Sequence, residues 1–124
     1  VPRLNQCQFG PSPHAGVPAA ALRNDELIER VLDDYTTASI DERLRATLRL
    51  LETMTLRHEN LTADDVPAVM RQGVSKGAIR DALEVAFLFN IYDRLADSMG
   101  WDVPSRSSGF YQTGAKRLLG RGYN

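Results

Sequence analysis

The feature that most constrains this fold is a long apolar segment, roughly Lys76 to Met99. Ser75 is a favourable N-cap immediately before it, and Gly100 can end a helix in the left-handed conformation. Apolar residues in this segment lie so close together that a helix would be apolar nearly all round: Ala82, Leu83, Val85, Ala86, Phe87, Leu88, Phe89 and Ile91. We therefore predict one long helix that is buried on several sides, either within one core or by a core and an oligomer interface together. Four small helices give little cover for such a helix, which favours self-association.

Two shorter segments, one near each end of the chain, also favour helices. Asn24 is a plausible N-cap, and the acids that follow it suit the positive end of a helix dipole. Apolar residues then recur at helical spacing: Leu27, Ile28, Val31, Leu32 and Tyr35. Near the other end, we expect a last helix from Phe110 to Leu119, whose end is frayed by the glycines at 120 and 122.

Two capping-box patterns predict two further helices in the middle of the chain. Ser39 and Glu42 have the spacing of such a box ahead of a helix that should end near residues 55–58. Thr62 and Asp65 repeat that spacing ahead of a short helix, for which Gly73 can supply a left-handed exit.

The arrangement of these segments indicates a single all-α domain. The sequence has 124 residues, which suits one hydrophobic core, and it shows no alternating strand pattern and no internal repeat. Residues 1–19 are rich in proline and glycine, so we expect an irregular segment there, and residues 104–124 form a C-terminal tail. We predict a single-domain helical bundle of about five helices over residues 1–124.

Composition argues against several classes of partner. Fifteen basic residues balance sixteen acidic ones without a basic block, so nucleic acid is not expected as a partner. No apolar run approaches the length that crosses a bilayer, so no membrane partner is expected either. The single cysteine, Cys7, and the lack of a recognisable targeting segment favour a cytoplasmic location.

Cys7 and His14 are the clearest candidates for chemistry. They are seven residues apart, so two helical turns would place the thiol and the imidazole on one side. A thiolate is the reactive form of cysteine, and an imidazole can lower the pKa of a thiol and pass a proton to a leaving oxygen. The simpler interpretation is that Cys7 is a small buried apolar residue and His14 a loop residue.

A second set of candidates lies on the long segment. Arg94 could orient a carboxylate substrate, and Asn90, which interrupts an apolar stretch, needs a hydrogen-bond partner and could bond a backbone near the site. The alternative for Arg94 is a surface residue or an ion pair between subunits. His58, Glu59 and Asn60 have no companion His or Cys at ligand spacing, so the sequence indicates no metal site and no cofactor.

Several motifs together resemble the alkylhydroperoxidase D-like branch of the carboxymuconolactone decarboxylase family. That branch carries Cys-x-x-Cys-x-x-x-His, and Cys7, Gly10 and His14 fall on this frame with glycine at the second cysteine. Four further segments resemble the second half of the family: Glu52-Thr53-Met54-Thr55, Leu61 to Val66, Gly73-Val74-Ser75, and Phe89-Asn90 through Arg94-Leu95-Ala96-Asp97 with the closing Gly100. The last of these is the most specific.

The resemblance implies a peroxidase-related oxidoreductase with an antioxidant role. In such proteins two cysteines cycle through a disulfide, and a glutamate well before the first cysteine completes a proton relay. Because Gly10 replaces the second cysteine, and the glutamate would lie before residue 1, the site has two of its four parts. Cys7 would then act with a small peroxide and an external thiol reductant, and the family implies a homo-oligomer, a trimer or hexamer.

Two other functions stay open at this stage. The first is a carboxymuconolactone decarboxylase-like enzyme, in which His14 acts as the base and an arginine holds the substrate carboxylate. The second is a helical oligomer or binding module without enzymatic activity, in which the same residues serve only packing and helix capping.

Overall fold

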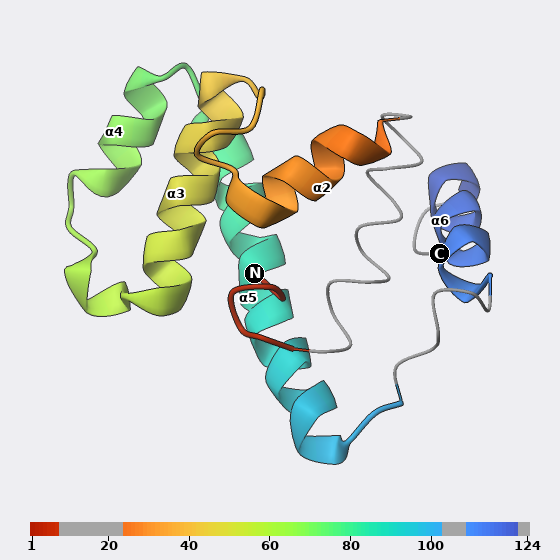
Figure 1. Cartoon of the computed structure of the whole chain (residues 1–124). Coiled ribbons are helices and arrows are strands. Elements are labelled where there is room, and N and C mark those ends of the chain that lie inside the picture. The colour runs from red at the N-terminus through yellow and green to blue at the C-terminus, as the bar shows by residue number, and fades with distance from the viewer. Residues whose placement is uncertain (8–23, 103–108, 122–124) are drawn as a thin grey trace.

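The computed structural model describes residues 1–7, 24–102 and 109–121, and within these ranges it contains helices and no strand. Five α-helices occur in the order α2 (Asp25–Asp34), α3 (Glu42–Leu56), α4 (Asp65–Arg71), α5 (Lys76–Met99) and α6 (Phe110–Arg121), with a short 3-10 helix η1 (His58–Asn60) after α3 (Figure 1). The predicted all-α class is therefore confirmed over the described residues. None of these helices is long and apolar enough to cross a membrane.

The hydrophobic core lies where α3, α4 and α5 meet. One buried residue from each helix forms its centre, namely Leu50, Val69 and Ile79. Four partly buried apolar residues pack around them: Ala46, Val66, Val74 and Leu83. Burying a side chain of this size contributes roughly 1.5–3 kcal/mol to the stability of the fold. Packing in this small cluster therefore holds the three helices together.

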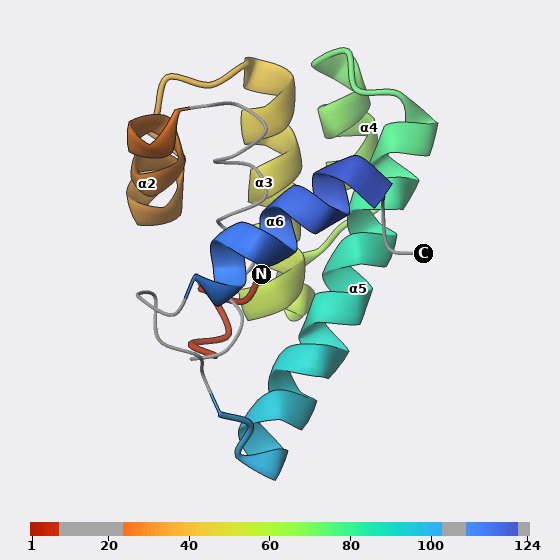
Figure 2. The same cartoon turned by 90° about the vertical axis from the view of Figure 1, so that its right-hand side faces the viewer.

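The ends of α5 lie where the sequence predicts them. The Ser75 hydroxyl accepts a hydrogen bond from the Ala78 amide at 3.1 Å, and Gly100 ends the helix with φ of 61°. Gly73 likewise adopts φ of 88° after α4, a conformation that glycine adopts without steric cost. The C-terminal end of α5 extends beyond the other helices in both side views (Figures 1 and 2).

Three of the predicted helix ends are wrong. Asp41, not Ser39, caps α3, because its carboxylate is near enough to accept the Arg43 amide at 2.8 Å. The Asp65 carboxylate accepts the Thr62 amide at 2.6 Å, which is one half of the expected box, but α4 begins only at Asp65. At the other end of the chain, α6 continues past position 120 to Arg121, so the glycine there does not end it.

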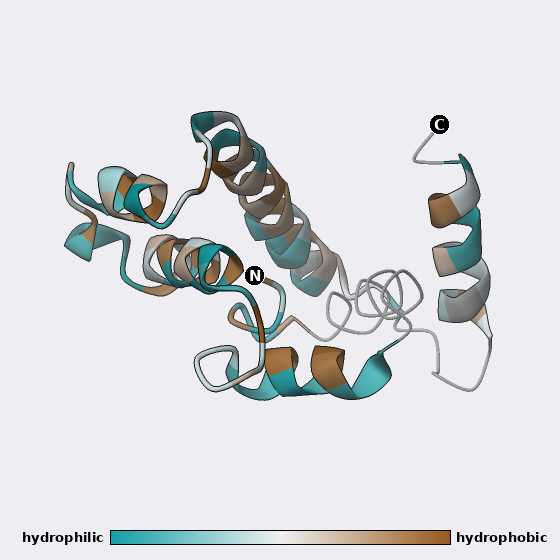
Figure 3. Ribbon diagram, turned by 90° about the horizontal axis from the view of Figure 1, so that it is seen from above, coloured by the Kyte–Doolittle hydropathy of each residue, from teal (hydrophilic) through white to brown (hydrophobic). Residues whose placement is uncertain are grey.

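The expectation that α5 is buried on several sides is also wrong within one chain. Its buried residues follow a single stripe, namely Ile79, Ala86, Asp93 and Ala96. Seven large side chains, which we call the outer face of α5, are 41–64% exposed: Val85, Phe87, Leu88, Ile91, Tyr92, Leu95 and Met99. In Figure 3, apolar colouring recurs along the α5 ribbon. The reason is geometric, since among the described helices only α3 has an extensive contact with α5, and one helix cannot cover another on all sides.

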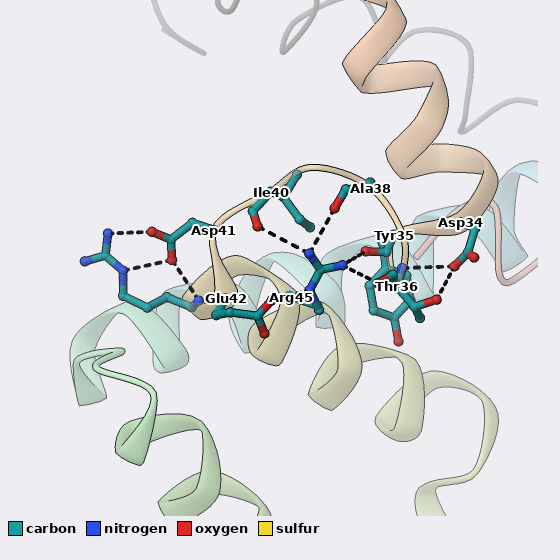
Figure 4. Close-up of polar contacts among 9 residues, drawn as sticks. Asp34, Tyr35, Thr36, Ala38, Ile40, Asp41, Glu42 and Arg45 are labelled. Carbon is teal, nitrogen blue, oxygen red and sulfur yellow. Dashed lines mark hydrogen bonds and ion pairs between the residues drawn. The ribbon is translucent and has the colours of Figure 1, made fainter.

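Arg45 joins α2 to α3. From α3 its guanidinium donates to the backbone carbonyls of four residues in the connecting turn, namely Tyr35, Thr36, Ala38 and Ile40 (Figure 4). Its Nε also donates to Glu42 at 2.7 Å. Arg45 is 14% exposed in its side chain, so these charge-assisted bonds are largely shielded from water and fix the exit of α2.

Candidate functional site

The first seven residues form a compact turn against α5. The Asn5 amide donates to the Val1 carbonyl at 3.0 Å, and the Cys7 amide donates to the Pro2 carbonyl at 3.2 Å. Between them, Gln6 has φ of 56°, an uncommon conformation for a residue that carries a β-carbon. The turn brings Cys7 inside the protein, where it is 2% exposed.

The turn is attached to α5 by a group of amide and carboxylate side chains. Asn5 donates from Nδ2 to Asp93 Oδ2 at 2.8 Å and to Asn90 Oδ1 at 3.2 Å. Asn90 in turn donates to the Ala86 carbonyl at 2.9 Å. We call Asn5, Asn90 and Asp93 the polar cluster. It joins positions 85 and 88 residues apart in the sequence.

Asp93 is the buried acid of this cluster, with 3% exposure. A carboxylate removed from water is costly unless it accepts hydrogen bonds, and the Asn5 amide supplies one. The pairing therefore makes the position of the N-terminal turn depend on Asp93, and the position of Cys7 depends on that turn.

Arg94 lies at the exposed edge of the polar cluster. Its Nη1 donates to the Asn90 backbone carbonyl at 2.5 Å and to Asn90 Oδ1 at 3.2 Å. Arg94 thus places a positive charge one residue after Asp93 while its guanidinium bonds within its own helix. The Asn90 side chain consequently contacts both the N-terminal turn and Arg94.

The structure brings some of the candidates from the sequence together. The turn that carries Cys7 lies against Asn90, and Arg94 borders it, whereas His14 lies outside the described residues. The sequence interpretation missed Asn5 and Asp93. A signal for Asp93 was present, because it follows Ala86 by seven residues and Ile79 by fourteen, which puts an acid on the buried stripe.

A second polar contact lies on α3. The Tyr35 hydroxyl donates to Glu52, and Arg57 Nη2 lies 3.9 Å from Glu52 Oε1. Burial and the hydrogen bond to Glu52 raise the pKa of Tyr35 to about 12. At ordinary pH this tyrosine is a hydrogen-bond donor that ties the end of α2 to α3, and we assign it a structural role.

Hollows on the described surface are lined by other residues. One of about 500 Å³ lies between the start of α3 and the turn before α5, with Asp41, Arg43, Gly73 and Ser75 among its lining residues. Ser75 precedes Asn90 by fifteen residues on a helix that rises 1.5 Å per residue, a separation of roughly 20 Å. Among the described residues, no group of three or more His, Cys, Asp or Glu is arranged to hold a metal ion.

Comparison of the chain with protein-family models, with curated proteins and with solved structures finds no match.

Proposed function

We propose that this chain is a peroxidase-related redox protein in which the Cys7 thiol reduces a small peroxide and an external thiol restores it. The observation that supports this proposal most is the docking of the N-terminal turn on α5. Through Asn5, that turn meets Asn90 and Asp93, so the two segments on which the proposal rests lie side by side.

The proposed reaction has two stages. In the first, the Cys7 thiolate attacks one peroxide oxygen, the O–O bond breaks, and Cys7 becomes a sulfenic acid while the other oxygen takes a proton and leaves as an alcohol or water. In the second, an external thiol forms a mixed disulfide with Cys7 and releases water. A second external thiol then displaces Cys7, which returns as a thiol, and the two external thiols leave as a disulfide.

Each residue near the turn has a stated role in this proposal. His14 passes the proton to the leaving oxygen. Asn90 and Arg94 bind the peroxide substrate at the edge of the polar cluster, where Arg94 supplies a positive charge. The protein acts in the cytoplasm as a homo-oligomer, a trimer or hexamer as in the family that the chain resembles.

Intact-mass spectrometry with a sulfenic-acid trap tests the proposal. The unmodified chain is treated with dilute hydrogen peroxide, alongside Cys7→Ser and His14→Ala. We expect one trapped adduct in the unmodified chain, none in Cys7→Ser, and slower trapping in His14→Ala. Adding a small thiol before the trap should return the oxidised chain to its starting mass.

A matched control separates chemistry from simple exposure of the thiol. In urea-unfolded protein Cys7 reacts as an ordinary cysteine, and this rate is the reference. Trapping in the folded protein that is no faster than this reference would show that the fold does not activate Cys7, and the peroxidase proposal would then fail.

One observation favours a second candidate, a helical oligomer without enzymatic activity. Cys7 is 2% exposed, and a cysteine buried in this way is usually inert. In this case a thiol reagent should modify Cys7 in the folded protein far more slowly than in the unfolded chain, and peroxide should leave the folded protein unchanged.

A further inference from the structure

The exposed apolar side chains on the outer face of α5 are too many and too regularly spaced to be the scattered apolar residues that most protein surfaces carry. Five of its members, Val85, Leu88, Tyr92, Leu95 and Met99, are separated alternately by three and four residues, which is the spacing that helices use to pack along one another. Phe87 and Ile91 widen this stripe, and Phe87 is 62% exposed. The face extends over fifteen residues, or roughly 21 Å of helix.

The size of the face can be compared with known interfaces. With the observed exposures, 41–64%, its seven side chains leave on the order of 700 Å² of apolar surface open to water. This exceeds the apolar patches of roughly 300–600 Å² on typical monomers. It comes close to the area of about 800 Å² that each partner contributes to a standard interface.

From this face we infer that a second copy of the chain packs against α5, outer face to outer face. A pairing of this kind uses one patch twice, so the patch must complement itself. The seven members of the outer face are uncharged, so two copies can meet there without bringing like charges together. The Arg80–Glu84 ion pair borders the face, because it lines one hollow with Phe87 and Leu88. The charged residues of α5 between Val85 and Met99 lie elsewhere: Asp93 is buried on the opposite stripe, Arg94 bonds back to Asn90, and Asp97 follows on the helix outside the face.

In this pairing, the buried and the exposed sides of α5 contact different partners. The stripe with Ile79 and Asp93 holds the core and the N-terminal turn of its own chain, while the outer face holds the second copy. This pairing is two-fold, so of the assemblies included in the proposed function it fits a hexamer and not a trimer, and it does not depend on the thiol chemistry. Sedimentation tests the surface and sulfenic-acid trapping tests the chemistry, so one can fail without the other.

Sedimentation velocity from low to high micromolar concentration tests the inference. We expect the unmodified chain to sediment as a dimer or a larger species. Leu88→Glu places a charge at the centre of the paired faces and should weaken association at least about 30-fold, the loss associated with an interface hot spot. Leu95→Glu on the same stripe should act in the same direction.

Leu119→Glu is the matched control, because Leu119 on α6 is 50% exposed, as is Leu88. It introduces the same charge at the same exposure and should leave the sedimentation unchanged. Circular dichroism establishes that each variant keeps its helices. A monomeric unmodified chain at every concentration would overturn the inference, and so would equal association of Leu88→Glu and the unmodified chain.

Discussion

The two halves of α5 hold their neighbours by different kinds of contact. In the first half, Ile79 packs with Leu50 of α3 and Val69 of α4 in one apolar cluster. In the second half, Asn90 and Asp93 hold the N-terminal turn through hydrogen bonds to Asn5. Apolar packing tolerates small shifts, whereas a hydrogen bond requires a particular donor and acceptor. The first half therefore supplies stability, and the second half specifies the place of one segment, the turn that carries Cys7.

The largest expected effect is in the apolar half. Ile79→Ala leaves a cavity between three helices and should lower the free energy of unfolding by about 3 kcal/mol. Urea denaturation followed by circular dichroism measures this change. Leu56→Ala, at a position 45% exposed on α3, is the control and should change the free energy by less than about 0.5 kcal/mol. Equal losses in both variants would mean that Ile79 is not at the centre of the core.

The polar half should respond less in stability and more in the accessibility of Cys7. Asp93→Ala removes the acceptor for Asn5 and should lower the free energy of unfolding by about 2 kcal/mol. Because the N-terminal turn loses this bond, a thiol reagent should modify Cys7 several times faster than in the unmodified chain.

Two further variants sharpen that comparison. Asp93→Asn keeps an oxygen that can accept from Asn5 and should restore slow modification of Cys7. Asp97→Ala removes an exposed acid one turn later on α5 and should change nothing. If Asp93→Ala left Cys7 as protected as before, the polar cluster would not control the position of the turn.

A smaller effect is expected at the polar contact on α3, and it depends on pH. The pKa of Tyr35 is raised from 10.0 to about 12 in the folded protein, so the folded state holds this proton more tightly than the unfolded state. The corresponding stability is fully present below pH 10 and is lost as the pH rises through about 12. Tyr35→Phe should lower the free energy of unfolding by about 1 kcal/mol at neutral pH.

Urea denaturation at neutral pH and at pH values up to 12 measures this dependence. The unmodified chain should lose more stability over the alkaline range than Tyr35→Phe, because the variant lacks the group that titrates. Parallel losses in the two proteins would show that Tyr35 ionises alike in the folded and unfolded states. The Asn5 contact with Asp93 contains no tyrosine and should contribute nothing to the difference.

The smallest expected effect is at Gln6, within the N-terminal turn. Gln6→Gly removes the steric cost of a left-handed residue but adds flexibility to the unfolded chain, so the free energy of unfolding should rise by only about 0.5 kcal/mol. Gln6→Ala keeps the β-carbon and should show no gain. Thermal unfolding measured for the two variants side by side checks this prediction, and a loss of stability in Gln6→Gly would contradict it.

Local signals in the sequence predicted the local features of the fold. Asn24, Ser75 and Gly100 each act within a few residues of the helix end that they define, so neighbouring positions suffice to identify them. The cap at Asp41 was missed because Ser39 and Asp41 are both good caps. The choice depends on the turn whose carbonyl groups bond to Arg45, a contact that no local pattern in the sequence indicates.

Contacts between distant parts of the chain could not be predicted in the same way. The burial of α5 depends on how many helices cover it, which its own apolar pattern does not specify. The sequence therefore left open whether the apolar belt is core alone or core plus an oligomer interface. The bond between Asn5 and Asp93 joins positions 88 residues apart, and neither residue has a motif that indicates the other. The sequence thus singled out Cys7, Asn90 and Arg94 as candidates, whose roles stay predictions, but it gave no pointer to the two side chains that attach the turn.

The bonds of Arg45 have a consequence for how freely the chain can vary. Arg45 donates to main-chain carbonyl groups at four positions between α2 and α3, and every amino acid carries such a group. The side chains at Thr36 and Ile40 can therefore be exchanged while the joint keeps its hydrogen bonds, whereas Arg45 itself cannot be replaced by lysine without losing the planar fork. Across variants of this chain, sequence diversity should gather in the turn, and one arginine on α3 should stay constant.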